Sequence, residues 1–346
     1  MKTRGYAALE AKADLVPFEF ERRNVQDFDV AFDITFSGIC HSDIHQAREE
    51  WGKALFPMVP GHEIVGVVTS IGAKVSRFNV GDIIGVGVFI DSCRKCSNCL
   101  RGLQQYCLEG MTGTYNGYER NSQKIAFGGY SKHFVIHEDY AVHVPKNLPQ
   151  SGVAPLLCAG ITLYSPIKHW NVGPQTKVAV MGLGGLGHMG VKFAVALGAE
   201  VTVFSHSPAK EHDARQMGAQ HFVVTKSDDW HKPLRKKYHV ILNTVSADLD
   251  LEPYLSTVAT DGTLVIIGLP GKPYAINAGT MLDGRRSIAG SMIGGMPELQ
   301  EMIDFCGKKN IVSEVEVIKA DYINHAYDRT VASDVKYRFV IDASTF

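Results

Sequence analysis

The stretch Lys177–Gly187, KVAVMGLGGLG, decides the fold class of this 346-residue chain. Its first half, Lys177–Met181, has no charged residue after the lysine, which is typical of a strand buried on both faces of a parallel sheet. Glycines follow at once, and an apolar run then continues to Leu197. The pattern predicts a tight turn that leads into a helix over Gly187–Leu197.

Glycines at a strand-to-helix turn allow the backbone to approach a pyrophosphate, and the start of the helix offers free N–H groups and a positive dipole end. The turn therefore predicts a dinucleotide site, because it lies between a strand and a helix. The alternative is a glycine-rich turn that binds nothing. The predicted contacts are Gly182, Gly184, Gly185, Leu186 and Gly187.

Strand and helix patterns alternate beyond this turn, which favours βαβ units and a parallel sheet. The expected strands are Glu200–Phe204, Phe222–Val224, His239–Asn243 and Thr263–Gly268, and a helix is expected over Ala209–Met217. We expect an α/β fold with a doubly wound, parallel Rossmann sheet in this part of the chain.

The preceding part of the chain differs in character. Its short β-rich runs, separated by Gly and Pro, predict a compact and mainly β unit. These runs are Glu63–Ser70, Asp82–Ile90 and Tyr140–Val144, and Ser151–Lys168 reads as helical. The tail from about Pro297 shows one helix, Glu298–Lys308, and short β-like runs that end at Asp342.

We expect the tail to fold back onto the first unit, since the βαβ run lies between them. The predicted domains are therefore residues 1–157 with 296–346, and residues 158–295. A chain of this length exceeds the size at which one core usually keeps growing.

Composition excludes several classes of protein. Hydrophobic residues make up 45% of the chain, charged residues 21%, and the net charge is −1, so we expect neither a nucleic-acid nor a membrane partner. Met1–Val16 carries charges throughout and does not resemble a signal peptide. We expect a cytoplasmic protein whose cysteines bind metal or act in catalysis.

The end of the strand Glu200–Phe204 bears on the choice between NAD and NADP. An NAD site usually has Asp or Glu there to accept from the ribose 2′-hydroxyl, but this chain has no carboxylate before Glu211. Hydroxyls and positive charge, which suit a 2′-phosphate, come instead from Ser205, His206, Ser207 and Lys210. The sequence favours NADP(H); the alternative is a polar loop in which Ser207 caps the next helix.

Four of the seven cysteines form a C-x2-C-x2-C-x7-C array made of Cys93, Cys96, Cys99 and Cys107. Four thiolates can close a tetrahedral zinc site, and the spacing also leaves an iron–sulfur cluster open. Arg94, Lys95 and Arg101 lie beside the array and offset its negative charge. With all four positions filled, we expect the metal to be structural, holding a loop with little core of its own.

A catalytic zinc needs three protein ligands and one open position. The candidates are Cys40, His62 and Cys158, but their spacing does not select them. A single buried cysteine such as Cys158 is more often a small core residue.

Six segments, in this order, carry a resemblance to a known family: Gly38–His45, Gly61–Gly66, the four-cysteine loop, Pro155–Tyr164 (PLLCAGITLY), Gly182–Gly190 (GLGGLGHMG) and Lys336–Asp342 (KYRFVID). The sequence resembles the zinc-containing medium-chain dehydrogenase/reductase superfamily, and within it the cinnamyl alcohol dehydrogenase-like group. The resemblance implies a GroES-like catalytic domain beside the Rossmann domain.

The same resemblance implies roles for individual residues. It implies that Cys40, His62 and Cys158 bind a catalytic zinc, so that each chain holds two Zn²⁺ ions. Glu63 would approach this metal during ligand exchange, and Asp43 would orient His62. Ser42 would take the proton from the substrate oxygen and His45 would pass it outward. Further cofactor contacts are implied at Thr162, Asn243, Thr244, Val245, Gly268, Ser291 and Ile293.

The implied function is an NADP(H)-dependent alcohol dehydrogenase that interconverts primary alcohols and aldehydes, with a homodimer expected from the family. Plant cinnamaldehyde reductases tend to have a Trp before a Tyr-Asn pair, whereas this chain has Thr112–Asn116, TGTYN. Trp51 and Phe89 are the candidates for an apolar wall, and we expect aromatic and medium aliphatic aldehydes as substrates. The alternative is a catalytically silent, zinc-stabilised cofactor-binding protein on the same scaffold.

Overall fold

The computed structural model describes residues 1–120 and 122–346, and the chain divides into two compact units. The first unit comprises Met1–Ile161 with Gly294–Phe346, and the second comprises Thr162–Ile293. The predicted boundaries lie at 157/158 and 295/296, and the units divide at 161/162 and 293/294. The tail thus belongs to the first unit.

The second unit is built on a six-stranded parallel sheet in the order β12-β11-β10-β13-β14-β15. This arrangement confirms the predicted doubly wound sheet. The strands are β10 (Lys177–Met181), β11 (Glu200–Ser205), β12 (His221–Val224), β13 (Tyr238–Asn243), β14 (Val258–Ile266) and β15 (Ser287–Gly290). β10 lies in the middle of the sheet because its apolar side chains are buried.

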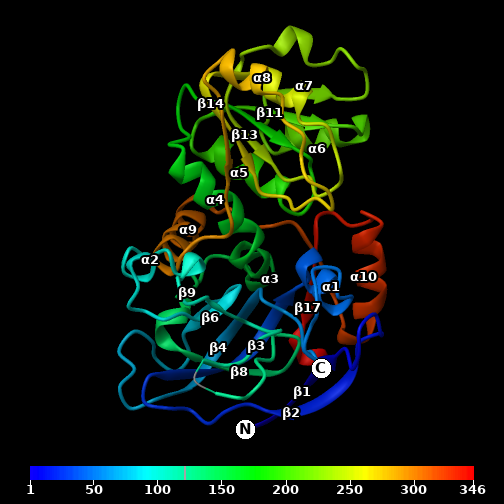
Figure 1. Ribbon diagram of the computed structural model, residues 1–346. Helices are drawn as coiled ribbons and strands as arrows, with labels where there is room; N and C mark the ends of the chain where they lie inside the picture. The colour runs from blue at the N-terminus through cyan, green and yellow to red at the C-terminus, as the bar shows by residue number, and fades with distance from the viewer. Residues whose placement is uncertain (121) are drawn as a thin grey trace. The chain divides into compact units, whose positions relative to one another are not determined.

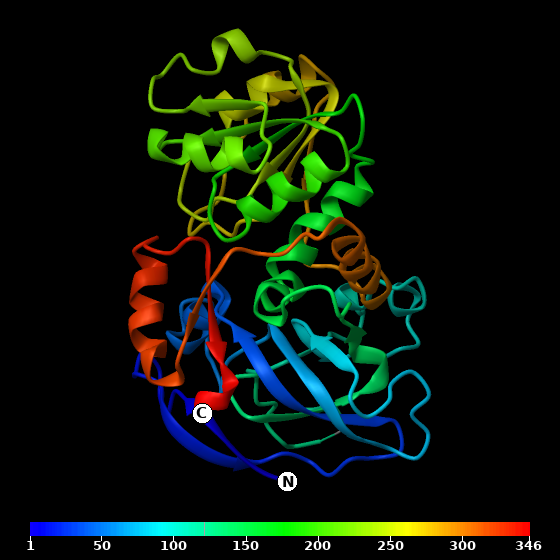
Figure 2. The same ribbon diagram turned by 180° about the vertical axis from the view of Figure 1, so that it is seen from behind.

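Helices cover both faces of this sheet, with α5 and α6 on one face and α7 and α8 on the other (Figures 1 and 2). Their bounds are α5 (Gly187–Ala196), α6 (Glu211–Gln216), α7 (Glu252–Thr257) and α8 (Ala278–Leu282). The turn between β10 and α5 is the glycine stretch Gly182–Gly187.

The first unit is mainly β, as expected. Its seven-stranded sheet runs β16-β17-β3-β4-β5-β9, and β8 pairs with β3. The strands are β3 (Asp29–Gly38), β4 (Ile64–Ile71), β5 (Ile83–Val86), β8 (His133–His137), β9 (Val142–His143), β16 (Val315–Ile318) and β17 (Arg338–Asp342). Two small sheets accompany it: β1 (Lys2–Ala7) with β2 (Val16–Glu21), and β6 (Phe89–Asp91) with β7 (Thr112–Gly113).

The helices of the first unit lie at the ends and edges of this sheet. They are α1 (His41–Ala47), α2 (Ser97–Leu100), α3 (Gln150–Val153), the start of α4 (Ala159–His169), α9 (Met296–Lys309) and α10 (Ile323–Val331). The prediction of a single helix in the tail was wrong, because α10 follows α9 and lies beside α1 in both views (Figures 1 and 2). The predicted continuous helix Ser151–Lys168 is interrupted by the 3-10 turn η3 (Ala154–Leu157) and by Cys158.

Every helix within residues 1–120 and 122–346 is too short or too polar to span a lipid bilayer.

Candidate metal centres and cofactor site

Cys40 lies between the end of β3 and the start of α1, where it is the N-cap residue. Asp43 occupies the third helical position, and its Oδ2 accepts a hydrogen bond of 2.9 Å from the backbone N–H of Cys40. The helix α1 therefore begins at His41, directly after Cys40, and ends at Ala47. This capping box fixes the backbone on which the Cys40 thiol sits.

His62 is oriented by the same carboxylate. Its Nδ1 lies 2.9 Å from Oδ1 of Asp43, which also accepts from the N–H of Gly61 at 3.1 Å. Burial opposes a charge on the ring, but Asp43 outweighs burial and raises the pKa of His62 well above its ordinary value. Because Nδ1 faces the carboxylate, Nε2 is left as the ligand atom, as in many metal sites.

Cys158 follows η3 and precedes α4, and it brings the third candidate ligand into the same place. One ligand atom from each of Cys40, His62, Glu63 and Cys158 lies within 4.8 Å of the others. All of these residues belong to the first unit. The structure thus gathers a two-sulfur, one-nitrogen donor set from three separate segments, which is a set that zinc binds in catalytic sites.

Glu63 is fully buried and pairs with Arg338, a residue that the sequence analysis left without a role. Nη2 of Arg338 lies 2.5 Å from Oε1 of Glu63. The other oxygen, Oε2, has no hydrogen-bond partner among the described residues. Burial raises the pKa of Glu63, whereas the adjacent Arg338 guanidinium opposes this shift and favours the ionised carboxylate. A buried carboxylate oxygen that lacks a hydrogen-bond partner would be stabilised by a nearby cation, so these residues fit a metal ion.

The four-cysteine loop forms a second candidate metal centre. Its four sulfurs lie within 4.8 Å of one another, and Cys93 Sγ is 3.9 Å from Cys99 Sγ. Sulfurs around a tetrahedral zinc lie about 3.8 Å apart, given Zn–S bonds of about 2.3 Å. The N–H of Leu108 donates to Cys96 Sγ at 3.4 Å, and such backbone donors lower the pKa of the half-buried Cys96 thiol to about 6. The loop fits a four-thiolate metal ion with no position left open.

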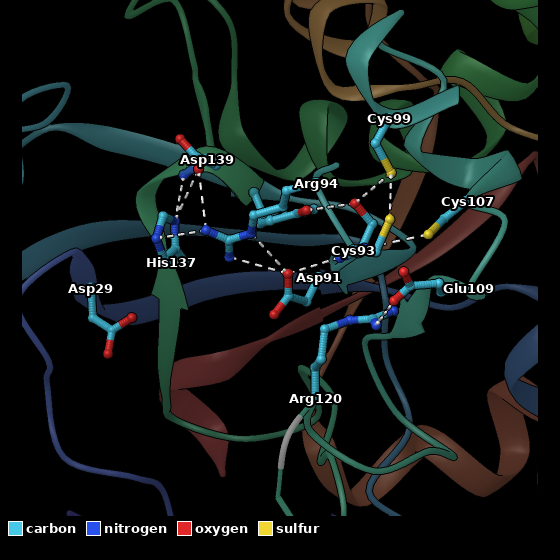
Figure 3. A network of polar contacts seen from close by, with 12 residues as sticks. Asp29, Asp91, Cys93, Arg94, Cys99, Cys107, Glu109, Arg120, His137 and Asp139 are labelled. Carbon is cyan, nitrogen blue, oxygen red and sulfur yellow. Dashed lines mark hydrogen bonds and ion pairs between the residues drawn. The ribbon is translucent and has the colours of Figure 1, made fainter. Parts of the chain in front are cut away.

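Charged side chains hold this loop to the β body (Figure 3). Arg94 adopts a positive φ of 61° between Cys93 and Cys96. Its guanidinium donates to Asp91 Oδ1 at 3.1 Å and to Asp139 Oδ2 at 3.4 Å. Arg94 therefore ties the loop to Asp91 and Asp139, and its role in offsetting the thiolate charge stays a prediction.

The two residues of the predicted proton path lie on α1. The Cys40 thiol lies 3.6 Å from Ser42 Oγ, so Ser42 is beside the first candidate metal centre. His45 lies one turn further along α1, where its Nδ1 contacts Oε2 of Glu50. Its ring stacks on the Trp51 ring, with the two ring centroids 4.8 Å apart. Trp51, proposed as an apolar wall, therefore packs against the histidine, whereas Phe89 is buried against Tyr140.

The glycine turn has the backbone geometry that a bound phosphate needs. Gly182 has a φ of +85°, and a Cβ on Gly187 would lie 2.0 Å from the carbonyl oxygen of Gly182. A Cβ on Gly184 would meet open space, and Leu186 is the N-cap of α5. The turn therefore leaves room at the start of a helix, which is where a pyrophosphate binds.

The four candidate 2′-phosphate residues gather after β11. Nζ of Lys210 donates to the carbonyl of Leu183 at 2.8 Å, which places the ammonium beside the glycine turn. Oγ of Ser205 accepts from the N–H of Ser207 at 3.1 Å, and His206 is exposed next to them. The hydroxyl of Ser207 makes no cap hydrogen bond to the following 3-10 turn.

The remaining candidate cofactor residues, apart from Thr162, lie at or shortly after the carboxyl ends of the parallel strands. Asn243 Oδ1 accepts from Val245 N at 3.1 Å, and Thr244 Oγ1 donates to the carbonyl of Met181 at 2.7 Å. A Cβ on Gly268 would lie 2.4 Å from the carbonyl oxygen of Val245. The other three are Thr162 in α4, Ser291 directly after β15 and the buried Ile293, with a φ of +41°.

Comparison with known proteins identifies the family of this chain. Residues 26–146 match the alcohol dehydrogenase GroES-like domain, and residues 185–308 match the zinc-binding dehydrogenase domain. An NADP-dependent alcohol dehydrogenase C of Mycolicibacterium smegmatis is 52% identical over 341 residues, which are 98% of this chain and 97% of that protein.

Solved structures give the same result. A cinnamyl alcohol dehydrogenase of Sorghum bicolor superposes with a TM-score of 0.96 and 41% identity, over 99% of this chain and 98% of that one. A cinnamyl alcohol dehydrogenase of Helicobacter pylori complexed with NADP(H) superposes with a TM-score of 0.93 and 40% sequence identity, over 99% of each chain. The resemblance noted from the sequence is confirmed: this chain belongs to the zinc-binding alcohol dehydrogenase family, in the cinnamyl alcohol dehydrogenase-like group.

Proposed function

We propose that the protein is a zinc- and NADP(H)-dependent alcohol dehydrogenase that interconverts primary alcohols and aldehydes. The observation that carries this proposal is the cluster of Cys40, His62 and Cys158 beside a buried carboxylate oxygen without a partner. The relatives whose names state an NADP-dependent alcohol dehydrogenase activity support it. All seven proposed zinc ligands are present in this chain, which argues against a catalytically silent protein.

The two implied groups supply the chemistry that amino acids lack: zinc acts as a Lewis acid on the substrate oxygen, and the nicotinamide gives or accepts the hydride. The chain holds the metal with two thiols and one imidazole, and Asp43 fixes the ring of His62. Glu63, kept in place by Arg338, is the carboxylate available during ligand exchange. The Cys93, Cys96, Cys99 and Cys107 set would hold a second, structural zinc.

Ser42 and His45 are proposed to move the proton. The Ser42 hydroxyl, next to the Cys40 thiol, takes or returns the proton of the substrate oxygen. His45 passes it on, and the contact of its Nδ1 with the Glu50 carboxylate leads toward solvent. Both residues come from α1, so the helix that begins at the first metal ligand also carries the proton path.

The preference for NADP(H) is proposed to come from the loop after β11. Lys210 supplies positive charge, Ser205 and Ser207 supply hydroxyls, and no carboxylate stands there to repel a phosphate. Remaining contacts with the cofactor are assigned to the glycine turn and to the strand-end residues described above. A carboxylate-free loop of this kind is the opposite of the usual NAD arrangement.

Aromatic and medium aliphatic aldehydes are the proposed substrates. Tyr115 stacks on the His62 ring at 5.8 Å and gives the first metal centre an aromatic neighbour. The proposed assembly is a homodimer, for which β15 offers an edge strand of the parallel sheet. A cytoplasmic location is proposed because metal-binding thiols need a reducing compartment.

A cofactor comparison tests the proposal. Initial rates of reduction of benzaldehyde and hexanal are measured with NADPH and with NADH, using the full chain with its metal content determined. We expect both aldehydes to be reduced and NADPH to be preferred. Absence of NADPH oxidation with both aldehydes in a chain that contains two zinc ions contradicts the proposed activity, and an equal kcat/KM for NADH contradicts the proposed cofactor preference.

A further inference from the structure

Ser92 connects the four-cysteine loop to the body of the first unit. Its side chain is buried, with 1% exposure, and it directly precedes Cys93. Its Oγ lies 3.2 Å from Cys99 Sγ and 2.8 Å from the phenol oxygen of Tyr140. A sulfur, a hydroxyl and a phenol thus form a chain of hydrogen bonds that ends on a proposed metal ligand.

The direction of this chain follows from the protonation state of the sulfur. A metal-bound cysteine is a thiolate, which carries no proton and can only accept. Ser92 has one hydroxyl proton, so it must donate that proton to Cys99. The Tyr140 phenol must then donate to Oγ of Ser92, and the order Tyr140 to Ser92 to Cys99 is fixed.

Tyr140 is itself held firmly. It is 2% exposed. Its ring and the Phe89 ring pack in a T-shaped arrangement with their centroids 5.9 Å apart, and the Arg94 guanidinium carbon lies 5.1 Å from the Tyr140 ring centroid. Phe89 comes from β6, and Tyr140 ends the short 3-10 turn η2 (Glu138–Tyr140) that follows β8. The first donor of the chain is therefore anchored outside the cysteine loop.

The other three sulfurs receive backbone donors. Cys96 N donates to Cys93 Sγ at 3.3 Å, Cys93 N donates to Cys107 Sγ at 3.3 Å, and Leu108 N donates to Cys96 Sγ at 3.4 Å. Cys99 receives a hydrogen bond from the backbone of Arg94 as well, and it has in addition a side-chain donor, the hydroxyl of Ser92. Four thiolates around one divalent ion carry a net charge of about −2, and each donor withdraws some of it.

We propose that Ser92 and Tyr140 are positioning residues of the four-cysteine metal site, in which a tyrosine-polarised serine hydroxyl stabilises the Cys99 thiolate and slows metal loss. This inference rests on the proposed metal at these four cysteines. It predicts that a single hydroxyl outside the ligand set controls the retention of the ion.

Cobalt absorption tests the proposal without reference to activity. The full chain is loaded with Co²⁺ at both sites, and the spectrum of each variant is subtracted from that of the wild type, so that the common contribution of the other site cancels. In Ser92→Ala the Cys99 thiolate loses a donor and becomes more electron-rich. Its sulfur-to-cobalt charge-transfer band is expected to move to lower energy, and Tyr140→Phe is expected to give a smaller shift in the same direction.

The rate of zinc release to a chromogenic chelator is the second readout. Ser92→Ala is expected to release the ion of the four-cysteine site about tenfold faster, which is the usual size of such an outer-shell effect. Ser92→Thr keeps the hydroxyl and is expected to restore the wild-type rate. Ser37→Ala is the matched control, because Ser37 is fully buried and its hydroxyl has no hydrogen-bond partner within residues 1–120 and 122–346.

The outcomes separate this inference from the proposed metal site. If Ser92→Ala and the wild type have the same cobalt spectrum and release rate, or if Ser37→Ala changes both equally, the positioning role is overturned. If Cys107→Ala binds as much metal as the wild type, the structural site itself fails, and the inference fails with it. A shift in Ser92→Ala and Tyr140→Phe that Ser92→Thr does not show supports it.

Discussion

Arg338 reaches Glu63 across 275 residues of sequence, and its guanidinium also donates to the carbonyl of Ile39 at 2.8 Å. Both side chains are buried, with 6% of the Arg338 side chain and none of the Glu63 side chain exposed. The arginine therefore joins the last strand of the chain to the two segments that carry Cys40 and His62. Removal of one partner from a buried ion pair strongly destabilises the folded protein, because the other charge is left buried and unpaired.

We expect Arg338→Ala to lower the free energy of unfolding by about 3–5 kcal/mol, because it leaves a buried carboxylate without its counter-charge. Urea unfolding of the zinc-loaded protein measures the change. Arg338→Met combined with Glu63→Gln removes both charges and is expected to recover most of the loss. A loss below about 1 kcal/mol in Arg338→Ala would show that the pair is dispensable.

Removal of one proposed ligand is expected to empty only one of the metal sites. Cys158→Ala should bind about one zinc ion per chain instead of two, and its aldehyde reduction should fall by at least about a thousandfold, since Lewis-acid assistance is worth several kcal/mol. Metal analysis and steady-state rates check both numbers. Cys306→Ala is the matched control, because Cys306 is a buried cysteine of α9 that contacts Met302 and belongs to neither sulfur cluster; it should keep two ions and full activity.

Replacement of Lys210 by alanine is expected to weaken the binding of NADPH but not that of NADH. A hydrogen bond to a charged group is worth about 1.5–3 kcal/mol, so KM for NADPH should rise about 10- to 100-fold while KM for NADH changes little. If both KM values rise equally, Lys210 serves the glycine turn through its bond to the Leu183 carbonyl rather than the 2′-phosphate. Lys226→Ala, an exposed lysine of the same unit, is the control.

Alkylation of the metal-free protein should label Cys96 at neutral pH but leave Cys306 unlabelled. Its pKa is lowered from 9.0 to about 6, mainly by the N–H of Leu108. Only the thiolate reacts, so labelling by iodoacetamide should be near its maximum at neutral pH and should fall as the pH drops through about 6. Burial raises the pKa of Cys306 to about 12, and this thiol should stay unlabelled. Peptide mapping by mass spectrometry measures the labelling of Cys96 and of Cys306. A pH midpoint near 9 for the labelling of Cys96 would contradict the prediction.

Local features of the sequence predicted much of this structure. The strand β10, the glycine turn and the four-cysteine array depend on residues close together in the chain, and the structure has all three. α10 was missed although Ile323, Ala326, Tyr327 and Thr330 are its buried residues at helical spacing. Two of these four are small or polar, so the apolar stripe is weak in the sequence.

Contacts between distant segments could not be predicted from spacing. The set of Cys40, His62 and Cys158 came from the family resemblance, because nothing local marks Cys158 as a ligand. No role was predicted for Arg338, although it begins the strand RFVID, in which three buried apolar residues follow it, and a charge at the start of such a run signals a buried partner. The partner itself, Glu63, becomes visible only when β17 pairs with β3.

The position of β17 has a consequence for the order of synthesis. Because β17 lies between β16 and β3 in the seven-stranded sheet, the first unit lacks an interior strand until residues 338–342 have been synthesised. The second unit, by contrast, is complete in the nascent chain some fifty residues earlier, by Ile293. A chain cut short before Arg338 would contain every proposed zinc ligand but would leave Glu63 without its counter-charge. Premature termination would therefore keep the proposed ligands and still disturb the proposed catalytic centre.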